Sequence, residues 1–234
     1  MEQNNDKKVS MPVIGDTAPS FEADTTQGKI KFPDDYKGKW VILFSHPADF
    51  TPVCTTEFMT FATMEKEFEE LNCKLIGLSI DSHYSHIAWL RTIKEKIHYK
   101  GMKDVEVNFP VIADLTMEVA CKFGMIQPCE SNVSAVRAVF FIDPKAKVRA
   151  LMYYPLSSGR NMQEIKRILI SMQTVDKYNV ATPADWRSGE DVIVPPPGSC
   201  GTAKERVKTA KKEGIKCLDW FICFKPLKLT QRIV

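Results

Sequence analysis

The stretch from Ser45 to Glu57 contains the residues whose types and spacing best suit a chemical reaction. Thr51 is a preferred residue for capping a helix, and Pro52 suits the first helical position, so we expect a helix to begin here. Cys54 then falls in the first turn, and we expect the Thr51 side chain to cap its backbone N–H. Unpaired N–H groups and the positive end of the helix dipole favour an anion there. The pattern predicts a reactive thiolate at Cys54, the alternative being an inert cysteine packed behind a strand.

The segments around this stretch alternate between strand and helix patterns. An apolar run at 40–44 is typical of a buried strand, and apolar residues at spacings of three and four over 58–71 indicate a helix after the cysteine. Further strands are predicted at 74–80, 109–112, 137–142 and 148–154, and further helices at 84–99, 117–123 and 165–172. The short entry after residue 10, with Pro12, Gly15 and Pro19, is interpreted as loop-rich. The order predicts an α/β fold with a central mixed sheet flanked by helices.

Composition excludes several classes of protein. The chain has 234 residues, of which 44% are hydrophobic and 26% charged, which is typical of a globular protein. Its apolar runs are too short to span a membrane, and a net charge of +3 is too small to indicate nucleic-acid binding. Residues 1–10 are polar, so we expect a disordered tail without a signal peptide, and a cytoplasmic location. Seven cysteines without a C-x-x-C pair argue against a static disulfide framework.

The spacing Pro47-x-x-x-Thr51-x-x-Cys54 resembles the active-site signature of the peroxiredoxins. The longer string from Ser45 to Glu57 is similar to their 1-Cys-type subfamily, and the resemblance extends over about residues 11–225. It implies a thioredoxin-like fold and thiol-dependent reduction of hydrogen peroxide and organic hydroperoxides, without a cofactor. We expect a peroxidase domain at 11–178 and a smaller dimerisation and resolving extension at 179–234.

The resemblance also implies roles for individual residues. Cys54 corresponds to the peroxidatic cysteine, which attacks the peroxide and becomes a sulfenic acid. Thr51 corresponds to the residue that holds the thiolate and the peroxide oxygens, and Pro47 to the residue that shields them from water. Arg137 corresponds to the catalytic, substrate-binding arginine, although an arginine at a strand start is more often a surface ion-pair partner.

Three further residues correspond to supporting positions of the subfamily. Arg160 matches a second arginine, and Glu57 is expected to position both arginines. His46 is expected near the peroxide pocket, with a histidine hydrogen-bonded to the backbone as an equal alternative. His83 and His86 are spaced three apart, but no Cys or carboxylate at matching spacing accompanies them, so we expect no metal site.

The C-terminal segment departs from the best-known 1-Cys enzymes, because Cys217 and Cys223 resemble the C-terminal cysteines of archaeal and bacterial members. By that resemblance Cys223 resolves the sulfenic acid of a neighbouring subunit, and Cys217 is an accessory thiol able to form a disulfide with it. A thioredoxin-like donor or another thiol reductant, and a homodimer or a decamer of five dimers, are then implied. The alternatives are a 1-Cys cycle with an external thiol, tail cysteines that merely pack on a partner, or a holdase chaperone ring.

Overall fold

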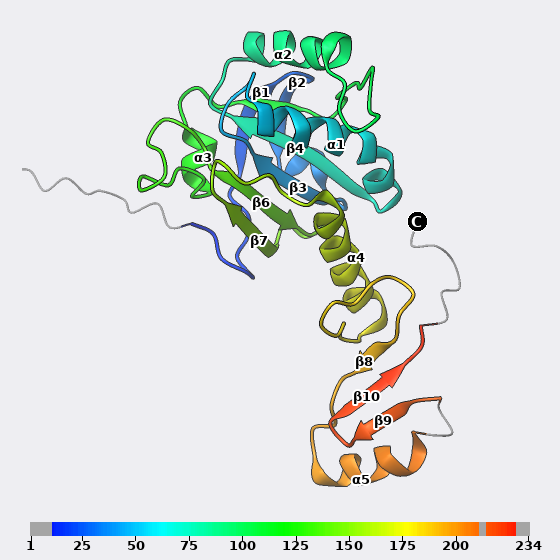
Figure 1. Ribbon diagram of the computed structural model, residues 1–234. Helices are drawn as coiled ribbons and strands as arrows, with labels where there is room; N and C mark the ends of the chain where they lie inside the picture. The colour runs from blue at the N-terminus through cyan, green and yellow to red at the C-terminus, as the bar shows by residue number, and fades with distance from the viewer. Residues whose placement is uncertain (1–10, 211–213, 228–234) are drawn as a thin grey trace, which may run out of the picture. The chain divides into compact units, whose positions relative to one another are not determined.

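The computed structural model describes residues 11–210 and 214–227, and the chain forms two compact units, 1–162 and 163–234 (Figure 1). The predicted tail at 1–10 lies outside the described residues. The predicted peroxidase domain at 11–178 and extension at 179–234 stay predictions.

The first unit is built around a seven-stranded mixed sheet in the order β2-β1-β5-β4-β3-β6-β7. Strands β3, β4 and β5 are parallel, and the other neighbours pair antiparallel. The strands are β1 (Phe21–Thr25), β2 (Gly28–Phe32), β3 (Trp40–Ser45), β4 (Cys73–Ser79), β5 (Val111–Ala113), β6 (Arg137–Ile142) and β7 (Val148–Tyr154). The α/β fold with a central mixed sheet is therefore confirmed.

Helices connect the parallel strands, as parallel pairing requires. The chain passes from β3 to β4 through α1 (Pro52–Glu70) and from β4 to β5 through α2 (His83–Lys96). The short helices η1 (Asp34–Tyr36) and α3 (Glu118–Lys122) lie in other connections. Every residue of β3 and β6 is buried, so these strands form the centre of the core. The loop from β3 into α1 is thus anchored at both ends by rigid elements.

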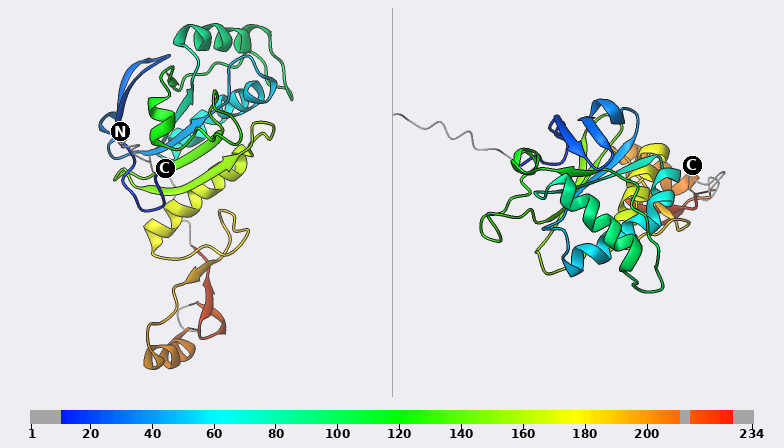
Figure 2. Two further views of the ribbon diagram at one scale, coloured as in Figure 1. Left: turned by 90° about the vertical axis from the view of Figure 1, so that its left-hand side faces the viewer. Right: turned by 90° about the horizontal axis from the view of Figure 1, so that it is seen from above.

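The antiparallel hairpin of β1 and β2 was not predicted, and the loop-rich entry with Pro12, Gly15 and Pro19 precedes it. Figure 2 shows this hairpin at an edge of the sheet. Gly28 has φ +100, a conformation that glycine adopts without strain, and this allows the short turn after Thr25. Most residues of the two strands are exposed or half-buried, so the apolar signal is weak.

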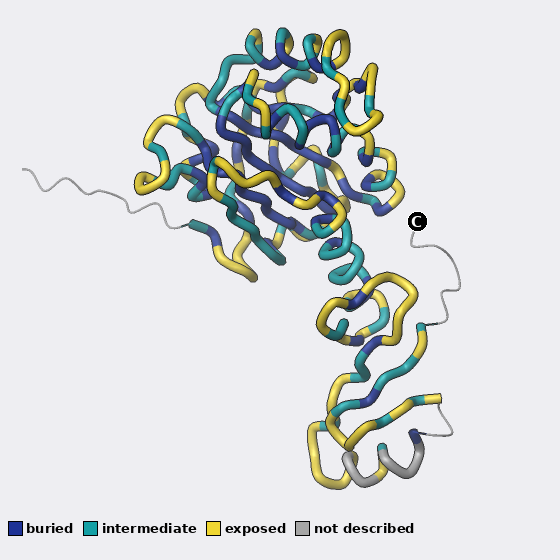
Figure 3. Tube along the Cα trace, viewed as in Figure 1, coloured by how far each residue is buried: buried dark blue, intermediate teal, exposed yellow. Residues whose placement is uncertain are grey.

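Aromatic side chains fill the core between α1 and the sheet. Phe44 of β3 stacks on Phe61 with ring centroids 4.3 Å apart, and Phe58 lies 5.6 Å from Phe44. Figure 3 shows the buried residues gathered on the central strands and on one side of α1. This packing fixes the helix whose first turn contains Cys54.

The second unit contains α4 (Met162–Tyr178), β8 (Val192–Val194), α5 (Cys200–Thr209), β9 (Lys216–Asp219) and β10 (Ile222–Lys225). The three strands form a small antiparallel sheet in the order β8-β10-β9. Val180, Trp186 and Val192 make a small buried cluster. Among the described residues, no helix is long and apolar enough to cross a membrane.

Candidate active site

Cys54 lies in the first turn of α1, as the sequence predicts. Thr51 is the N-cap residue with extended backbone, and Pro52 is at the start of the helix. The Cys54 side chain is 0% exposed and its thiol is free. The unpaired N–H groups of this turn and the helix dipole favour the anionic form of the sulfur.

The predicted capping bond of Thr51 is wrong. Its hydroxyl donates to the carbonyl of Ala48 at 2.8 Å and does not accept from the first turn of the helix. The Thr51 carbonyl in turn accepts hydrogen bonds from the backbone N–H and the hydroxyl of Thr55. Phe50, immediately before, has φ 56, so the tight turn redirects the threonine side chain toward the loop. Pro47 is buried in this same loop.

Arg137 lies beside the Cys54 sulfur although 83 residues separate them along the chain. Its Nη1 donates to Cys54 Sγ at 3.3 Å and to Glu57 Oε2 at 2.9 Å. Its Nε and Nη2 donate to the carbonyl of Leu156 at 2.9 and 2.7 Å. The guanidinium is 2% exposed, so its orientation is fixed and its charge is little screened.

Glu57 joins this arginine to a second one. Its Oε1 accepts hydrogen bonds from the backbone N–H and Nε of Arg160 at 2.8 and 3.0 Å, and its Oε2 accepts from Arg160 Nη2 at 2.6 Å. Burial raises the pKa of Glu57, but the charge and hydrogen bonds of Arg160, and then the charge of Arg137, outweigh it and hold that pKa below its usual range.

The charged side chains around the Cys54 sulfur do not balance one another. Two guanidinium groups and one ionised carboxylate leave one positive charge in a buried site, with Arg137 directed at Cys54. A buried charge needs a partner. Arg137 Nη1 points at the Cys54 sulfur, so an anion formed there is stabilised by this charge.

His46 is not hydrogen-bonded through its ring to the backbone, which removes that alternative. Its Nε2 lies 2.9 Å from Oδ1 of Asp49, and Oδ2 of Asp49 lies 2.8 Å from Nδ1 of His86. The other ring nitrogen of His86 lies 3.1 Å from the carbonyl of Ile112. The His46 ring also stacks on Trp89, with centroids 5.1 Å apart.

Asp49 was not singled out from the sequence, and His86 was considered only beside His83, as a metal pair that was set aside. His46, Asp49 and His86 offer ligand-type atoms within 4.8 Å of one another. Their separations of 2.8–3.0 Å are those of direct hydrogen bonds. We therefore interpret the three side chains as a hydrogen-bonded network. The available signal was His46-x-x-Asp49 at the end of a strand.

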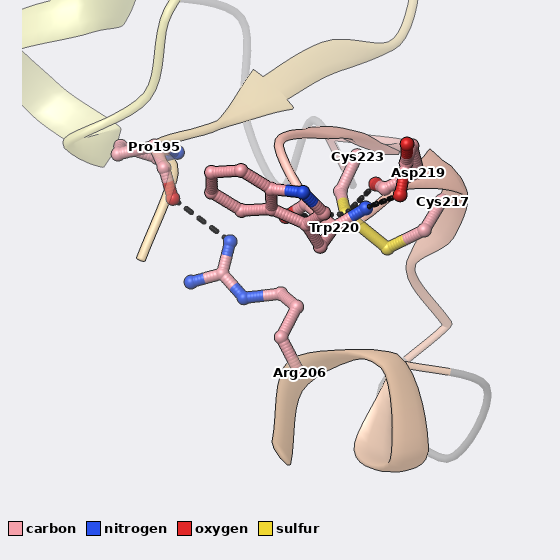
Figure 4. The surroundings of a disulfide bond; sticks show 6 residues. All are labelled: Pro195, Arg206, Cys217, Asp219, Trp220 and Cys223. Atoms are coloured by element: carbon pink, nitrogen blue, oxygen red, sulfur yellow. Dashed lines mark hydrogen bonds between the residues drawn. A yellow bond between two sulfur atoms is a disulfide. The ribbon is translucent and has the colours of Figure 1, made fainter. Parts of the chain in front are cut away.

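Cys217 and Cys223 form a disulfide that joins β9 to β10, which confirms the predicted possibility of this bond (Figure 4). Cys223 is 1% exposed and also lies opposite Val194 of β8. Cys217 is half-buried. Cys54 belongs to the first unit and this disulfide to the second.

The comparisons with known proteins agree with the fold and with the cysteine site. The chain matches the AhpC/TSA family over residues 14–151 and the C-terminal domain of 1-Cys peroxiredoxin over residues 171–210. It is 67% identical over 222 residues to a peroxiredoxin of Methanosarcina mazei, covering 95% of this chain and 100% of the relative. A peroxiredoxin of Aquifex aeolicus is 52% identical over 227 residues, with 93% and 98% covered.

Solved structures give the same answer. A structure of yeast mitochondrial 1-Cys peroxiredoxin superposes with a TM-score of 0.78 at 40% identity, covering 92% of this chain and 100% of that one. A mutant of the peroxiredoxin 6 of Arenicola marina gives 0.79 at 35% identity, with 92% and 97% covered. The fold is thioredoxin-like with a C-terminal extension. The chain belongs to the peroxiredoxin family and is a thiol-dependent peroxidase, with a peroxide substrate and a thiol reductant.

Proposed function

We propose that Cys54 is the peroxidatic cysteine and that Arg137 is its catalytic partner. The thiolate attacks one peroxide oxygen, an S–O bond forms as the O–O bond breaks, and the departing oxygen takes a proton from water to leave as water or an alcohol. Cysteine is oxidised to sulfenic acid and the peroxide is reduced. The contact of 3.3 Å between Arg137 Nη1 and Cys54 Sγ carries this proposal.

The other residues of the site position or shield Cys54 and Arg137. Arg160 and Glu57 hold Arg137 in place through the buried ion pairs. Thr51 holds the thiolate and the peroxide oxygens once its hydroxyl turns away from the Ala48 carbonyl. Pro47 excludes water from the loop, and His46 lies beside the peroxide pocket. The rate of peroxide attack then depends on a preorganised positive charge that does not need to move during the reaction.

Stopped-flow oxidation of the reduced protein by stoichiometric peroxide, followed by tryptophan fluorescence, tests the first half of the cycle. We expect a fast phase in the wild type that is absent in Cys54→Ser. Cys121→Ser is the matched control, because this cysteine is exposed on α3, and it should keep the fast phase. A fast phase that survives in Cys54→Ser would contradict the assignment.

For the second half, Cys223 of a partner subunit attacks the Cys54 sulfenic acid, releasing water and forming a Cys54–Cys223 disulfide. The Cys217 thiolate then attacks Cys223 and releases the Cys54 thiol, which leaves the Cys217–Cys223 disulfide. A thioredoxin-like dithiol donates the two electrons that reopen it. The presence of this disulfide in the structure supports the last oxidised state of the scheme. The scheme requires a homodimer, and a decamer and a cytoplasmic location stay predictions.

Thioredoxin-supported turnover separates this cycle from a 1-Cys cycle. Cys223→Ser should lose that turnover while keeping single-turnover oxidation of Cys54. Cys200→Ser, a change of an exposed tail cysteine outside the disulfide, is the control and should turn over normally. Undiminished turnover in Cys223→Ser would mean that an external thiol reduces the sulfenic acid directly. That alternative is supported by the similar yeast mitochondrial 1-Cys peroxiredoxin, whose thiol is resolved via glutathione and thioredoxin systems.

A further inference from the structure

His86 is a fully buried histidine that the peroxidase mechanism above does not use. It lies on α2, and its two ring nitrogens face two acceptors. Nδ1 is 3.0 and 2.8 Å from the two carboxylate oxygens of Asp49, and Nε2 is 3.1 Å from the carbonyl oxygen of Ile112. These groups come from the loop after β3, from α2 and from β5.

Counting protons assigns the state of each member of this network. A carbonyl oxygen only accepts, so Nε2 of His86 must carry a proton. Burial raises the pKa of Asp49, but the hydrogen bonds from His46 and His86 outweigh it and hold that pKa below its usual range. The carboxylate is therefore ionised and also only accepts, so Nδ1 of His86 must carry a proton as well. His86 with two protons is an imidazolium, and Asp49 supplies its counter-charge.

The same carboxylate fixes the tautomer of His46. Asp49 Oδ1 accepts from His46 Nε2, which must then be the protonated nitrogen. Full burial lowers the pKa of His46, against the opposing effect of Asp49, which favours a neutral ring. The proton-free atom is Nδ1, and this buried atom has no hydrogen-bond partner among the described residues. A buried acceptor without a partner calls for an explanation, and a reacting group is one.

We propose that His86 is a charged positioning residue for the peroxidatic loop: its imidazolium holds the Asp49 carboxylate, which keeps His46 in the Nε2-protonated form with Nδ1 as a free acceptor. The effect on catalysis rests on the proposed role of His46 beside the peroxide pocket. The His46 ring packs on Phe58, one turn after Cys54 on α1, with centroids 4.7 Å apart. The network thus fixes a neutral acceptor next to the helix that carries the nucleophile.

One more ionisable group touches the network. Asp81 Oδ2 accepts from the backbone N–H of Asp49 at 3.0 Å and from the hydroxyl of Ser79 at 2.7 Å. It therefore fixes the backbone that presents Asp49, from the loop that follows β4. The ionisable side chains that the structure places in the network are thus His46, Asp49, His86 and Asp81. A proton shared between Asp49 and either histidine keeps the same contact whether it lies on oxygen or on nitrogen, and the lowered pKa of Asp49 places it on nitrogen.

Magic-angle-spinning NMR of the reduced protein labelled with ¹⁵N-histidine tests the proton count directly. The chain has four histidines, and His→Gln variants assign their ring nitrogens. At pH 7 we expect two protonated nitrogens for His86, and a protonated Nε2 with an unprotonated Nδ1 for His46. An unprotonated nitrogen on His86, or a protonated Nδ1 on His46, would overturn the proposal. No peroxide is present, so this result is independent of whether Cys54 is the nucleophile.

His86→Gln tests the positioning role, with His83→Gln on the same helix as the matched control. The neutral amide cannot supply the charge, so we expect the His46 signals to become a mixture of tautomers. Oxidation of Cys54 by peroxide should slow about tenfold or more, because the loop loses its fixed geometry. His83→Gln should change neither readout. A single His46 tautomer and a wild-type rate in folded His86→Gln would contradict the proposal. If His86→Gln does not fold, the wild-type spectra still decide the question.

Discussion

Cys54 and Cys223 are both almost fully buried, yet different structures cover them. Cys54 lies against the core of the seven-stranded sheet, and a guanidinium is directed at its sulfur. Cys223 lies in strand β10 of a short hairpin that exposes apolar side chains at and near its tip. Their exposed fractions are 67% for Leu218, 46% for Trp220 and 50% for Phe221.

The difference in what covers the two cysteines suits the roles proposed for them, peroxide attack by Cys54 and resolution by Cys223. A preorganised site accelerates a reaction because its charges do not reorganise, whereas a resolving cysteine has to leave its cover to reach another sulfur. A segment with few buried apolar contacts opens at a low free-energy cost. We therefore expect the Cys54 site to tolerate little change and the hairpin tip to tolerate much.

The largest effect on the rate of Cys54 oxidation is expected from a change of the Arg137 guanidinium. Arg137→Lys keeps the charge but loses the fork that binds Leu156, Glu57 and the sulfur together. Oxidation of Cys54 by peroxide should slow by about 10² to 10³ in stopped-flow experiments. The control is Arg149→Lys at the far end of the β6–β7 pair, which should react like the wild type. An unchanged rate in Arg137→Lys would mean that charge alone is sufficient.

Glu57→Gln should give a large loss of stability. Removing this carboxylate leaves two buried guanidinium groups with reduced compensation, which costs about 3–5 kcal/mol in the free energy of unfolding. Urea denaturation at pH 7 measures this loss. Glu70→Gln, an exposed change at the end of the same helix, should lie within about 0.5 kcal/mol of the wild type. Equal stabilities for the two variants would refute the ion-pair account.

Acid should destabilise the Cys54 site by protonating the Glu57 carboxylate. Because the folded pKa of Glu57 lies below its unfolded value of about 4.3, its stabilisation is present above that pH. This stabilisation is lost as the pH falls through the folded pKa of Glu57. The lowered pKa of Asp49 also gives a stabilisation that is lost as the pH falls. The free energy of unfolding of the wild type should therefore fall as the pH drops below about 4.3. Glu57→Gln should show a shallower fall, and parallel curves would exclude this contribution.

The smallest effect on the free energy of unfolding is expected at the tip of the β9–β10 hairpin. Phe221→Ser should change the free energy of unfolding by about 0.5 kcal/mol or less, because the side chain is half exposed. Phe61→Ala in the core should cost about 3–5 kcal/mol in the same denaturation assay. A large loss in Phe221→Ser would show that the tip is packed in solution and would weaken the contrast between the two regions.

The local part of the site was predictable from the sequence because it depends on adjacent residues. Thr51, Pro52 and Cys54 specify the start of a helix by capping preference and by the fixed φ of proline. The direction of the Thr51 hydroxyl was not predictable. It depends on the left-handed turn at Phe50, which a capping rule does not include.

The long-range part of the site was not available from spacing. Arg137 lies 83 residues from Cys54, and Arg160 lies 103 residues from Glu57, so only the family resemblance pointed to them. Asp49 and His86 meet across 37 residues because α2 packs beside the loop after β3. Cys121 of α3 is exposed, whereas Cys73 of β4 is buried. A short helix with a weak pattern does not define its buried face.

The most direct test of the two-cysteine cycle is peptide mapping of disulfides in Cys217→Ser after one equivalent of peroxide. Without Cys217 the exchange step cannot occur, so the disulfide between the peroxidatic and resolving cysteines should accumulate. The account predicts a Cys54–Cys223 linkage between two chains, seen by mass spectrometry and as a dimer on a non-reducing gel. Cys54 recovered as sulfenic or sulfinic acid, with Cys223 as a free thiol, would contradict it.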